Sequence, residues 1–327
     1  MGTRIELSFG ATLLVLATAC GGGGDTGAVA GLPEYVIDEL PPLVVASDRK
    51  GECSGGSTDC YYAASDAKPA DLSCLRDYTF AKEGDLRTHT IEIGDFFIGD
   101  PIPDLCVNVY PDNVVPEEDE CGDTFTNASG VVSFEAPENA TIAYRVFARD
   151  GASTSGSFAD TVEVNFRTEG LTEPYLGTAL SIATLNLIPT LLQVRRAPGT
   201  SVIAATARDC DDDTFLGARM LLYTKDGELV PEGSGADDTI YRYFDSTDLP
   251  SAEQPWTHIN GLMGAVNVPA DEHEYFVEIW GRRAEGEPLE RIACELVPVL
   301  PNSATLLSLT PERKDGPDCP GKAPEGW

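Results

Sequence analysis

Short runs of alternating or mostly apolar residues recur at regular intervals from Leu86 onward, bounded by Gly, Pro, Asn and Asp. A period of two is typical of half-buried β-strands, and no long stretch with helical periodicity stands out. The predicted strands of the first half cover residues 89–97, 106–111, 131–135, 142–148, 160–166 and 175–184. Those of the second half cover residues 201–209, 219–225, 238–244, 265–268, 274–282, 292–299 and 304–309. The pattern predicts an all-β fold built as sandwiches.

The two halves resemble each other around one turn. Residues 127–137 read NASGVVSFEAP and residues 258–269 read HINGLMGAVNVP, and an apolar strand follows each motif. The glycine permits the positive φ of a hairpin turn, and the proline ends the strand. The second half contains an insertion around residues 226–257. The sequence therefore predicts an internal repeat.

The order of strand, polar turn, apolar strand and glycine-to-proline motif resembles the carboxypeptidase regulatory-like domain, a transthyretin-like β-sandwich. The resemblance covers about residues 86–167 and 199–310 and implies two tandem antiparallel β-sandwich (prealbumin-like) domains. We expect the first sandwich and a connector over residues 83–198, the second sandwich over residues 199–311 and a tail over residues 312–327. In that family the domain is usually an accessory module that binds or positions a partner.

The N-terminus carries an export signal. Residues Leu7 to Ala19 form an apolar stretch that follows Arg4 and ends in small residues before Cys20. The stretch is too short to span a bilayer, which needs ~20 residues, but it suits a secretory signal peptide. Residues 16–20, LATAC, resemble the lipobox of bacterial lipoproteins, in which the cysteine is acylated and becomes the new N-terminus. In the alternative, an ordinary signal is removed there and Cys20 stays a thiol.

The resemblance to lipoproteins implies a location. The glycine run after Cys20 has no side chains to pack and is typical of a flexible tether. We expect a signal peptide over residues 1–19 and a disordered, lipid-anchored tether with cysteine-containing loops over residues 20–82. Acyl chains on Cys20 would then hold the protein to a membrane of the cell envelope, at the outer membrane or the cell surface.

Eight further cysteines follow Cys20, an even number in a chain expected to be exported. An oxidising compartment favours disulfides, and eight cysteines allow 105 connectivities. The expected pairs are Cys53–Cys60 and Cys106–Cys121 from their short spacing, Cys210–Cys294 across the second half and, by elimination, Cys74–Cys319. No Cys-x-x-Cys pair is present, which argues against a zinc site.

The charge balance narrows the choice of partners. The chain has 54 acidic and 22 basic side chains, a formal net charge of −32. Such a surface repels nucleic-acid phosphates, because binding to a polyanion depends on neutralisation by Lys and Arg. The composition excludes nucleic acid and leaves an envelope protein or a polysaccharide as the expected partner.

One acidic run is a candidate cation site. Asp209, Asp211 and Asp213 alternate like the first three ligands of a calcium loop, with Asp212 between them. The glycine and the bidentate glutamate that an EF-hand needs further along are missing. A looser Ca²⁺ site is one hypothesis and a solvated acidic turn is the alternative, and we expect no other cofactor.

Three aromatic residues are candidates for ligand stacking. Tyr241 and Tyr243 alternate and therefore share one face of a predicted strand, with Trp256 following nearby. An exposed set would form a platform for sugar rings, whereas in the alternative the tyrosines face the core. This is the basis of a carbohydrate-binding hypothesis.

The sequence contains few residues and motifs that indicate catalysis. The sequence has three histidines and lacks the nucleophile-elbow, zinc-protease and phosphate-loop motifs. We therefore expect no catalytic residues and a non-enzymatic envelope lipoprotein that acts as a structural or binding module. The alternatives are a carbohydrate- or calcium-binding surface protein and a secreted hydrolase whose site is assembled from dispersed residues.

Overall fold

A computed structural model describes most of the chain after residue 67. The described residues are 45–47, 68–80, 82–116, 120–149, 151–168, 173–192, 194–233, 235, 237–245, 250–251, 254–284 and 286–322. Predictions for the signal segment, Cys20, Cys53 and Cys60 lie outside these residues.

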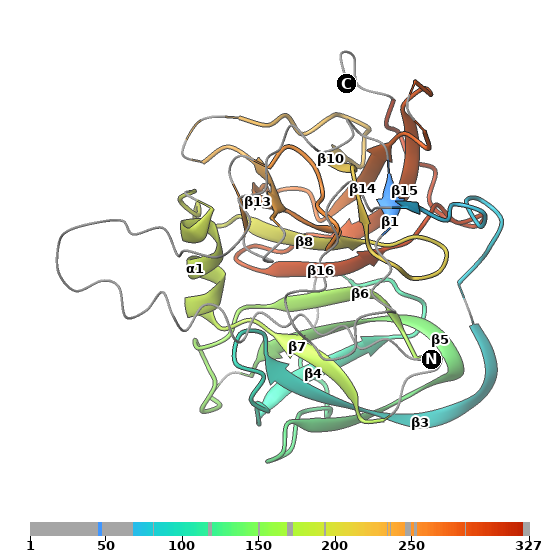
Figure 1. Ribbon diagram of the computed structural model, residues 1–327. Helices are drawn as coiled ribbons and strands as arrows, with labels where there is room; N and C mark the ends of the chain where they lie inside the picture. Colours follow the sequence, from blue (N-terminus) through green and yellow to red (C-terminus); the bar gives the residue numbers. More distant parts are fainter. Residues whose placement is uncertain are drawn as a thin grey trace, which may run out of the picture.

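The described chain is dominated by strands (Figure 1). Before the first half lie β1 (Ala46–Ser47) and β2 (Lys68–Pro69). The first half contains β3 (Lys82–Asp95), β4 (Leu105–Tyr110), β5 (Val131–Ala148), β6 (Thr161–Arg167) and β7 (Tyr175–Ala179), followed by the helix α1 (Ile182–Leu191). The second half contains β8 (Ser201–Ala207), β9 (Phe215–Leu216), β10 (Arg219–Thr224), β11 (Ile240–Phe244), β12 (Pro250–Ser251), β13 (Leu262–Val268), β14 (Glu274–Gly281), β15 (Glu290–Pro298) and β16 (Ala304–Leu309). The all-β prediction is confirmed, and the predicted strands over 131–135 and 142–148 form one long strand, β5.

The same pairing pattern occurs in both halves. In the first, β3 pairs with β7 in parallel and with the start of β5, while β4 and β6 pair with the end of β5. In the second, β8 pairs with β16 in parallel and with β13, while β10 and β15 pair with β14. The predicted insertion supplies β11 and β12, which extend the sheet beyond β13. Strands β3 and β7 therefore correspond to β8 and β16, and β5 corresponds to β13 followed by β14.

The repeated glycine turn fixes the correspondence residue by residue. Gly130 and Gly261 have φ values of 73° and 65°. The backbone N–H of Ile93 donates to the carbonyl of Gly130 at 2.9 Å, and that of Ala207 donates to the carbonyl of Gly261 at 2.8 Å. Ile93 at the end of β3 is thus equivalent to Ala207 at the end of β8.

One sheet runs through both halves. Strand β16 pairs in parallel with β6 as well as with β8, which gives the order β12-β11-β13-β8-β16-β6-β5-β3-β7 with β4 attached to β5. Residues 83–198 and 199–311 therefore share a hydrogen-bonded ladder. Most strand pairs are antiparallel, as predicted, but β16 runs parallel to β6 and β8, and β7 runs parallel to β3.

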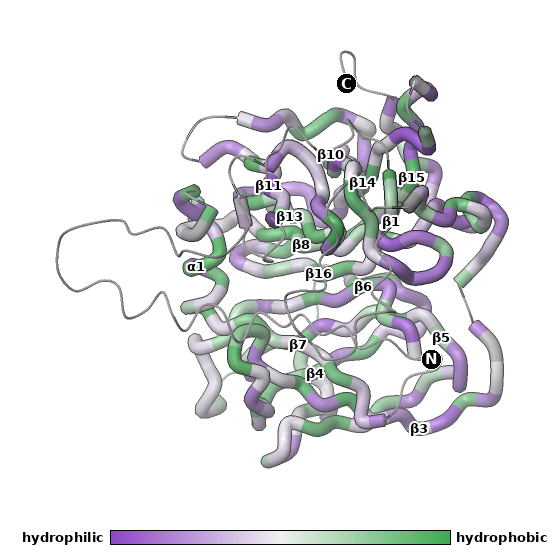
Figure 2. Tube along the Cα trace, viewed as in Figure 1, coloured by the Kyte–Doolittle hydropathy of each residue, from purple (hydrophilic) through white to green (hydrophobic). Residues whose placement is uncertain are grey.

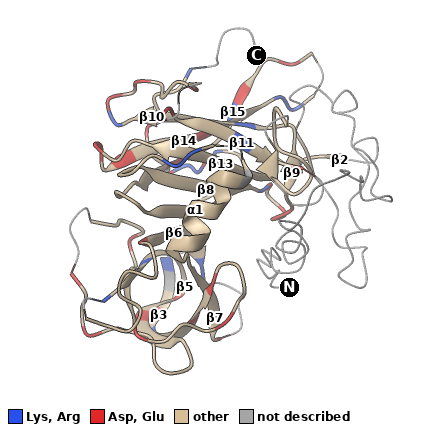
Figure 3. Cartoon of the chain, turned by 90° about the vertical axis from the view of Figure 1, so that its left-hand side faces the viewer, with Lys and Arg blue, Asp and Glu red and all other residues tan. Residues whose placement is uncertain are grey.

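Strand β6 lies between two hydrophobic cores. Val162 and Val164 belong to the larger core, which fills the space between this sheet and the sheet of β10, β14 and β15. Glu163 points to the opposite face, beside Tyr144 of the smaller core under β3 and β7. Further along that face, α1 packs on β8, β13 and β16. Hydrophobic positions follow these strands and the helix (Figure 2), and Figure 3 shows α1 in front of β8 and β6.

The helix replaces part of a predicted strand. Residues 175–184 were expected to be extended, but β7 ends at Ala179 and α1 begins after Ser181. The hydroxyl of Ser181 caps the helix by accepting the N–H of Thr184 at 3.1 Å. Leu185 and Leu192 are buried against the sheet. Burial of this apolar segment stabilises the helix although Pro189 lies within it.

Three disulfides join described residues. Cys106–Cys121 matches the pair predicted from spacing, whereas the predicted pairs Cys210–Cys294 and Cys74–Cys319 are wrong. The structure instead pairs Cys74 with Cys210 and Cys294 with Cys319. The segment around Cys74 packs against the turn after β8, where Cys210 donates its N–H to the carbonyl of Asp71 at 2.9 Å. The tail crosses β15, which brings its cysteine to that strand.

The segment before β3 and the C-terminal tail both bind to the second half. Strand β1 pairs with β9. Arg76 forms ion pairs with Glu312 at 2.7 Å and with Glu290 at 3.2 Å. The hydroxyl of Tyr78 donates to the carbonyl of Pro311 at 2.7 Å. The described part of the expected tether is therefore docked, and it contacts the tail through side chains.

Candidate functional site

The predicted calcium run forms a hydrogen-bonded turn. The carboxylate of Asp209 accepts the N–H groups of Asp211 and Asp213 on one oxygen and that of Asp71 on the other, all at 3.0 Å. Asp212 turns to Arg208, 3.7 Å away. Asp209 is buried, and its carboxylate holds backbone amides, which explains the run without a cation. Calcium binding here stays a prediction.

Potential metal ligands gather at one other place in the described part of the chain. Donor atoms of Glu278, Cys294 and Cys319 lie within 4.8 Å of one another, but the two sulfurs form a disulfide. The Glu278 carboxylate accepts the N–H of Gly321 at 2.8 Å and the indole N–H of Trp280 at 2.9 Å. This cluster anchors the tail and offers no thiolate to a metal.

The predicted aromatic platform is wrong. Tyr241 and Tyr243 are buried, because the alternation of β11 directs both rings into the larger core. The Tyr243 hydroxyl accepts the N–H of Met220 at 3.1 Å, and the Tyr241 hydroxyl donates to the carbonyl of Val230 at 2.7 Å. Trp256 is partly buried, with the Arg219 guanidinium 5.9 Å from its ring centre. No sugar can stack on the two tyrosines.

One histidine lies close to a carboxylate. His89 Nδ1 is 2.7 Å from the Tyr175 hydroxyl and 3.3 Å from Glu173, and its Nε2 is 3.0 Å from the carbonyl of Pro137. The His89 side chain is fully buried in the smaller core. A substrate cannot reach it, so the cluster is a packing network.

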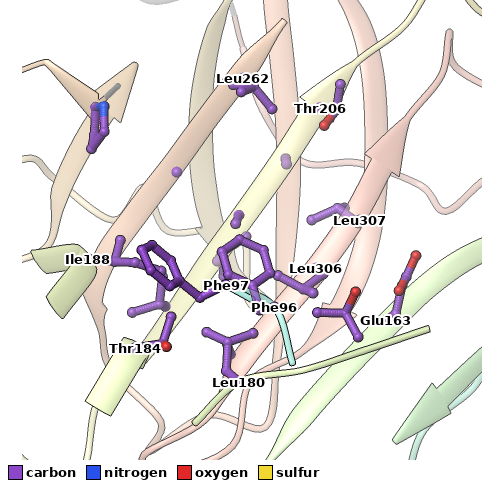
Figure 4. Close-up of a pocket in the computed structure, with 18 of the residues that line it drawn as sticks. Phe96, Phe97, Glu163, Leu180, Thr184, Ile188, Thr206, Leu262, Leu306 and Leu307 are labelled. Carbon is purple, nitrogen blue, oxygen red and sulfur yellow. The ribbon is translucent and has the colours of Figure 1, made fainter. Parts of the chain in front are cut away.

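An apolar pocket lies between α1 and the β3–β7 end of the shared sheet on one side and the strands β6, β16, β8 and β13 on the other. Its volume is about 350 Å³, within the range of small-molecule sites. The walls come from α1, β7 and the turn after β3, and the floor comes from β6, β16, β8 and β13. Figure 4 shows the rings of Phe96 and Phe97 in the middle, with Ile188 on one side and Glu163 on the other.

The strand register defines a row of residues across the floor. Glu163 on β6 is paired with Leu306 on β16, which is paired with Ala204 on β8. Ala204 is paired with Gly264 on β13, which is paired with Arg242 on β11. Four steps between strands of ~4.8 Å make the row ~19 Å long. The pocket therefore has a narrow apolar floor with an acid at one end and a base at the other.

The first half provides an internal control for this surface. Counting back from the matched turns, Thr90 and Ser133 of the first half correspond to Ala204 and Gly264. By the same register, the neighbouring pair Thr88 and Glu135 corresponds to Val202 and Val266. The face is thus polar in one copy of the repeat and apolar in the other. In the second half, Val202 and Val266 pack under α1, whereas the row through Ala204 and Gly264 continues along the floor of the pocket.

The rim of the pocket is also apolar. Leu176 on β7 is 62% exposed, and Leu187 on α1 is 37% exposed. The Asp95 carboxylate holds the turn by accepting the N–H groups of Phe97 at 2.8 Å and Ile98 at 3.1 Å. Grouped exposed apolar side chains around a cavity are typical of a binding site.

Glu163 is the acid of the pocket. The hydroxyl of Tyr144 donates to its carboxylate and itself accepts the N–H of Thr178 at 3.1 Å. Burial raises the pKa of Glu163 to about 7, although the Tyr144 hydrogen bond opposes the shift. Burial and the adjacent Glu163 charge raise the pKa of Tyr144. The carboxyl group can therefore change its charge near neutral pH.

Arg242, at the opposite end of the floor from Glu163, forms an ion pair with Glu232. Its guanidinium lies 3.2 Å from a carboxylate oxygen of Glu232 and donates to the carbonyl of Tyr241 at 2.8 Å. Its positive charge is thus largely compensated by a neighbour outside the floor.

Sequence reasoning missed every residue of this pocket. A local signal existed for the turn, because Asp95-Phe96-Phe97 places two adjacent aromatic residues after a strand. The position of Glu163 depends on the pairing of β6 with β16, which joins distant segments. That contact has no signature in the local pattern.

Comparisons with known proteins are weak. No family model matches the chain, and none of the curated proteins compared matches it. The TIE protein of Bacillus anthracis is 12% identical with a TM-score of 0.21, over 69% of this chain but 34% of that chain. The shaft pilin SpaA of Lactobacillus rhamnosus GG is 11% identical with a TM-score of 0.19, over 73% of this chain and 100% of that chain. The minor pilin GBS52 of Streptococcus agalactiae is 12% identical with a TM-score of 0.22, over 72% and 100%. Likenesses this distant carry no argument about function.

Among the described residues, no helix has the length and apolar character needed to cross a bilayer.

Proposed function

We propose that the protein is a non-enzymatic, exported binding module whose ligand site is the apolar pocket on the shared sheet. The observation that carries the proposal is the contrast between the repeats, with Thr90 and Ser133 in one copy and Ala204 and Gly264 in the other. A pocket lined mainly by apolar side chains and rimmed by exposed ones is typical of a ligand site.

The proposal includes anchoring to the cell envelope through Cys20 and two carboxypeptidase regulatory-like sandwiches. The motifs described in the sequence support both, and the repeated strand pairing supports a duplication. Intact mass of the protein purified from membranes tests the anchor. A mature N-terminus at Cys20 without acyl mass would contradict it.

An alternative hypothesis is that the acidic turn binds Ca²⁺ through the side chains of Asp211 and Asp213. An unfolding temperature that is the same in calcium and in chelator would end this hypothesis.

The pocket is tested with a neutral fluorescent apolar probe, N-phenyl-1-naphthylamine. Titration of the folded protein should give saturable binding. Ala204→Phe places a ring on the floor and should weaken binding at least about tenfold, as expected when ~1.4 kcal/mol of binding free energy is lost. The matched control, Ser133→Phe, puts the same ring on the corresponding face of the first half and should bind the probe like the wild type.

A second variant guards against misfolding of the first. Leu187→Glu changes an exposed rim position on α1, so it should leave the unfolding temperature nearly unchanged while weakening probe binding. Absence of probe binding by the wild type, or equal binding by Ala204→Phe and Ser133→Phe, would overturn the proposed function.

A further inference from the structure

Charge is distributed unevenly around the pocket. Four charged side chains line it, and three of them, Glu92, Asp95 and Glu163, are acidic. Arg242 is the fourth, and its charge is compensated by Glu232. The acids come from β3, its turn and β6, so they lie toward one end of the floor. The pocket therefore has an acidic end.

Glu163 has no cationic partner within the described part of the chain. The groups that act on its carboxylate are the surrounding apolar atoms and the Tyr144 hydroxyl. Asp95 differs, because its carboxylate is occupied by two backbone amides of the turn. Glu163 is half-buried, and a carboxylate removed from water without a counter-charge is unfavourable, so a cation from a ligand would reduce that cost.

Two aromatic rings line the same pocket as this acid. Phe96 and Phe97 lie between Glu163 and the helix (Figure 4). The face of a phenyl ring attracts a cation, and aromatic residues with a carboxylate are a common way to hold a quaternary ammonium group. The pocket thus offers a carboxylate and aromatic ring faces to a positive head group, and its acidic end repels a negative one.

Resting on the proposed function, we propose that the natural ligand class is a slender amphiphile with a cationic head group. The head lies beside Glu163 and the apolar chain follows Leu306, Ala204 and Gly264 across the floor. The middle of the row has the small residues Ala204 and Gly264, which line the pocket. A row of ~19 Å suits an extended chain better than a compact molecule.

Competition against the bound naphthylamine probe tests the head group. Dodecyltrimethylammonium, dodecanol and dodecyl sulfate share one chain and carry positive, neutral and negative heads. Below their micelle concentrations and at pH 8, the cation should displace the probe at a concentration at least about tenfold lower than the alcohol. Dodecyl sulfate should be the weakest competitor.

Two variants separate the site from the overall negative charge. Glu163→Gln should bring the ratio of cation to alcohol affinity toward one. Glu135→Gln removes one exposed carboxylate from the other half and should keep the wild-type ratio. An unchanged ratio in Glu163→Gln, or preference of the wild type for dodecyl sulfate, would overturn the inference.

The pH dependence is a further readout. Dodecyltrimethylammonium keeps its charge, whereas the carboxyl group of Glu163 ionises near pH 7. The other groups facing it are the Tyr144 phenol, Glu92 and Asp95, with Arg242 across the floor. Cation affinity should rise up to about tenfold from pH 6 to pH 8 in the wild type and stay flat in Glu163→Gln. A flat wild-type profile would contradict the role of Glu163.

The experiments distinguish failure of the proposed function from failure of the cationic ligand class. If the naphthylamine probe itself does not bind, the proposed function fails. If the probe binds and the three dodecyl compounds compete equally, the pocket stands and the cationic ligand class is refuted.

Discussion

Replacing Glu163 with glutamine should make the protein more stable at pH 8 and have little effect at pH 4. Glutamine has nearly the same shape as glutamic acid and never ionises. The side chain lies at the edge of the pocket, where burial raises its pKa to about 7 from an ordinary value of 4.5. The variant therefore removes one titration and keeps the packing.

The expected change in the free energy of unfolding follows from the pKa shift of Glu163. Each pKa unit corresponds to 1.36 kcal/mol, so the shift amounts to about 3 kcal/mol at most, and access of water to the pocket reduces it. The sign follows from linkage. A carboxyl group with a raised folded pKa favours the folded state below its unfolded pKa, and this contribution is lost as the pH rises through the folded pKa. The free energy of unfolding of the wild type should therefore lose this contribution from Glu163 between about pH 4.5 and pH 7.

Urea unfolding followed by tryptophan fluorescence measures the effect. Other groups titrate in the same range; burial lowers the pKa of His258 to about 4, for example, which acts in the opposite direction. The quantity to follow is therefore the difference between variant and wild type, which should grow by up to about 3 kcal/mol from pH 4 to pH 8. A difference that stays constant over this range would refute the assignment of Glu163 as a buried, unpaired acid.

Two further predictions concern stability. Gly261→Ala should destabilise the protein by about 3 kcal/mol or more in the same assay, because the new Cβ would lie 2.5 Å from the carbonyl oxygen of Ala207. The control Gly286→Ala has a similar φ but lies in open space, so it should cost about 1 kcal/mol. Equal effects would show that the close approach is unimportant. Replacing both Cys74 and Cys210 with alanine should cost about 5 kcal/mol, since their sequence separation is 136. A non-reducing peptide map that finds Cys74 joined elsewhere would contradict the pairing.

The strands could be predicted because their signals are local. Alternation along β8 and β14 and the glycine turns reveal which segments are extended, and the match of residues 127–137 with 258–269 reveals the repeat. Polar turns set the strand ends. Hydrophobic periodicity depends on the sequence of one segment, so it can be recognised without knowing which segments pack against it.

The helix and the disulfides could not be predicted in the same way. The α1 segment is apolar on several sides because it packs on the sheet near the pocket, so it has neither strand alternation nor a clear helical face. Cys74 meets Cys210 because the segment before β3 docks on the second half, and spacing along the chain contains no trace of that docking. Short spacing sufficed for Cys106–Cys121.

The pocket was beyond prediction for a related reason. Its floor exists because β6 from one half and β16 from the other run side by side in parallel. Glu163 reads locally as a polar position in a strand with an exposed face. Only the pairing between halves turns that position into the acidic end of an apolar floor.

The Cys74–Cys210 bond also determines how the molecule carries mechanical load. A pull on the chain before Cys74 passes through the disulfide to Cys210, so the backbone of residues 75–209 lies within a closed covalent loop that the force bypasses. That loop contains the whole first half together with α1 and β8. If the protein is anchored by its N-terminus, force reaches this loop only through noncovalent contacts such as the pairing of β16 with β6 and β8, so the covalent path of the load avoids the walls of the pocket contributed by β3, β7 and α1.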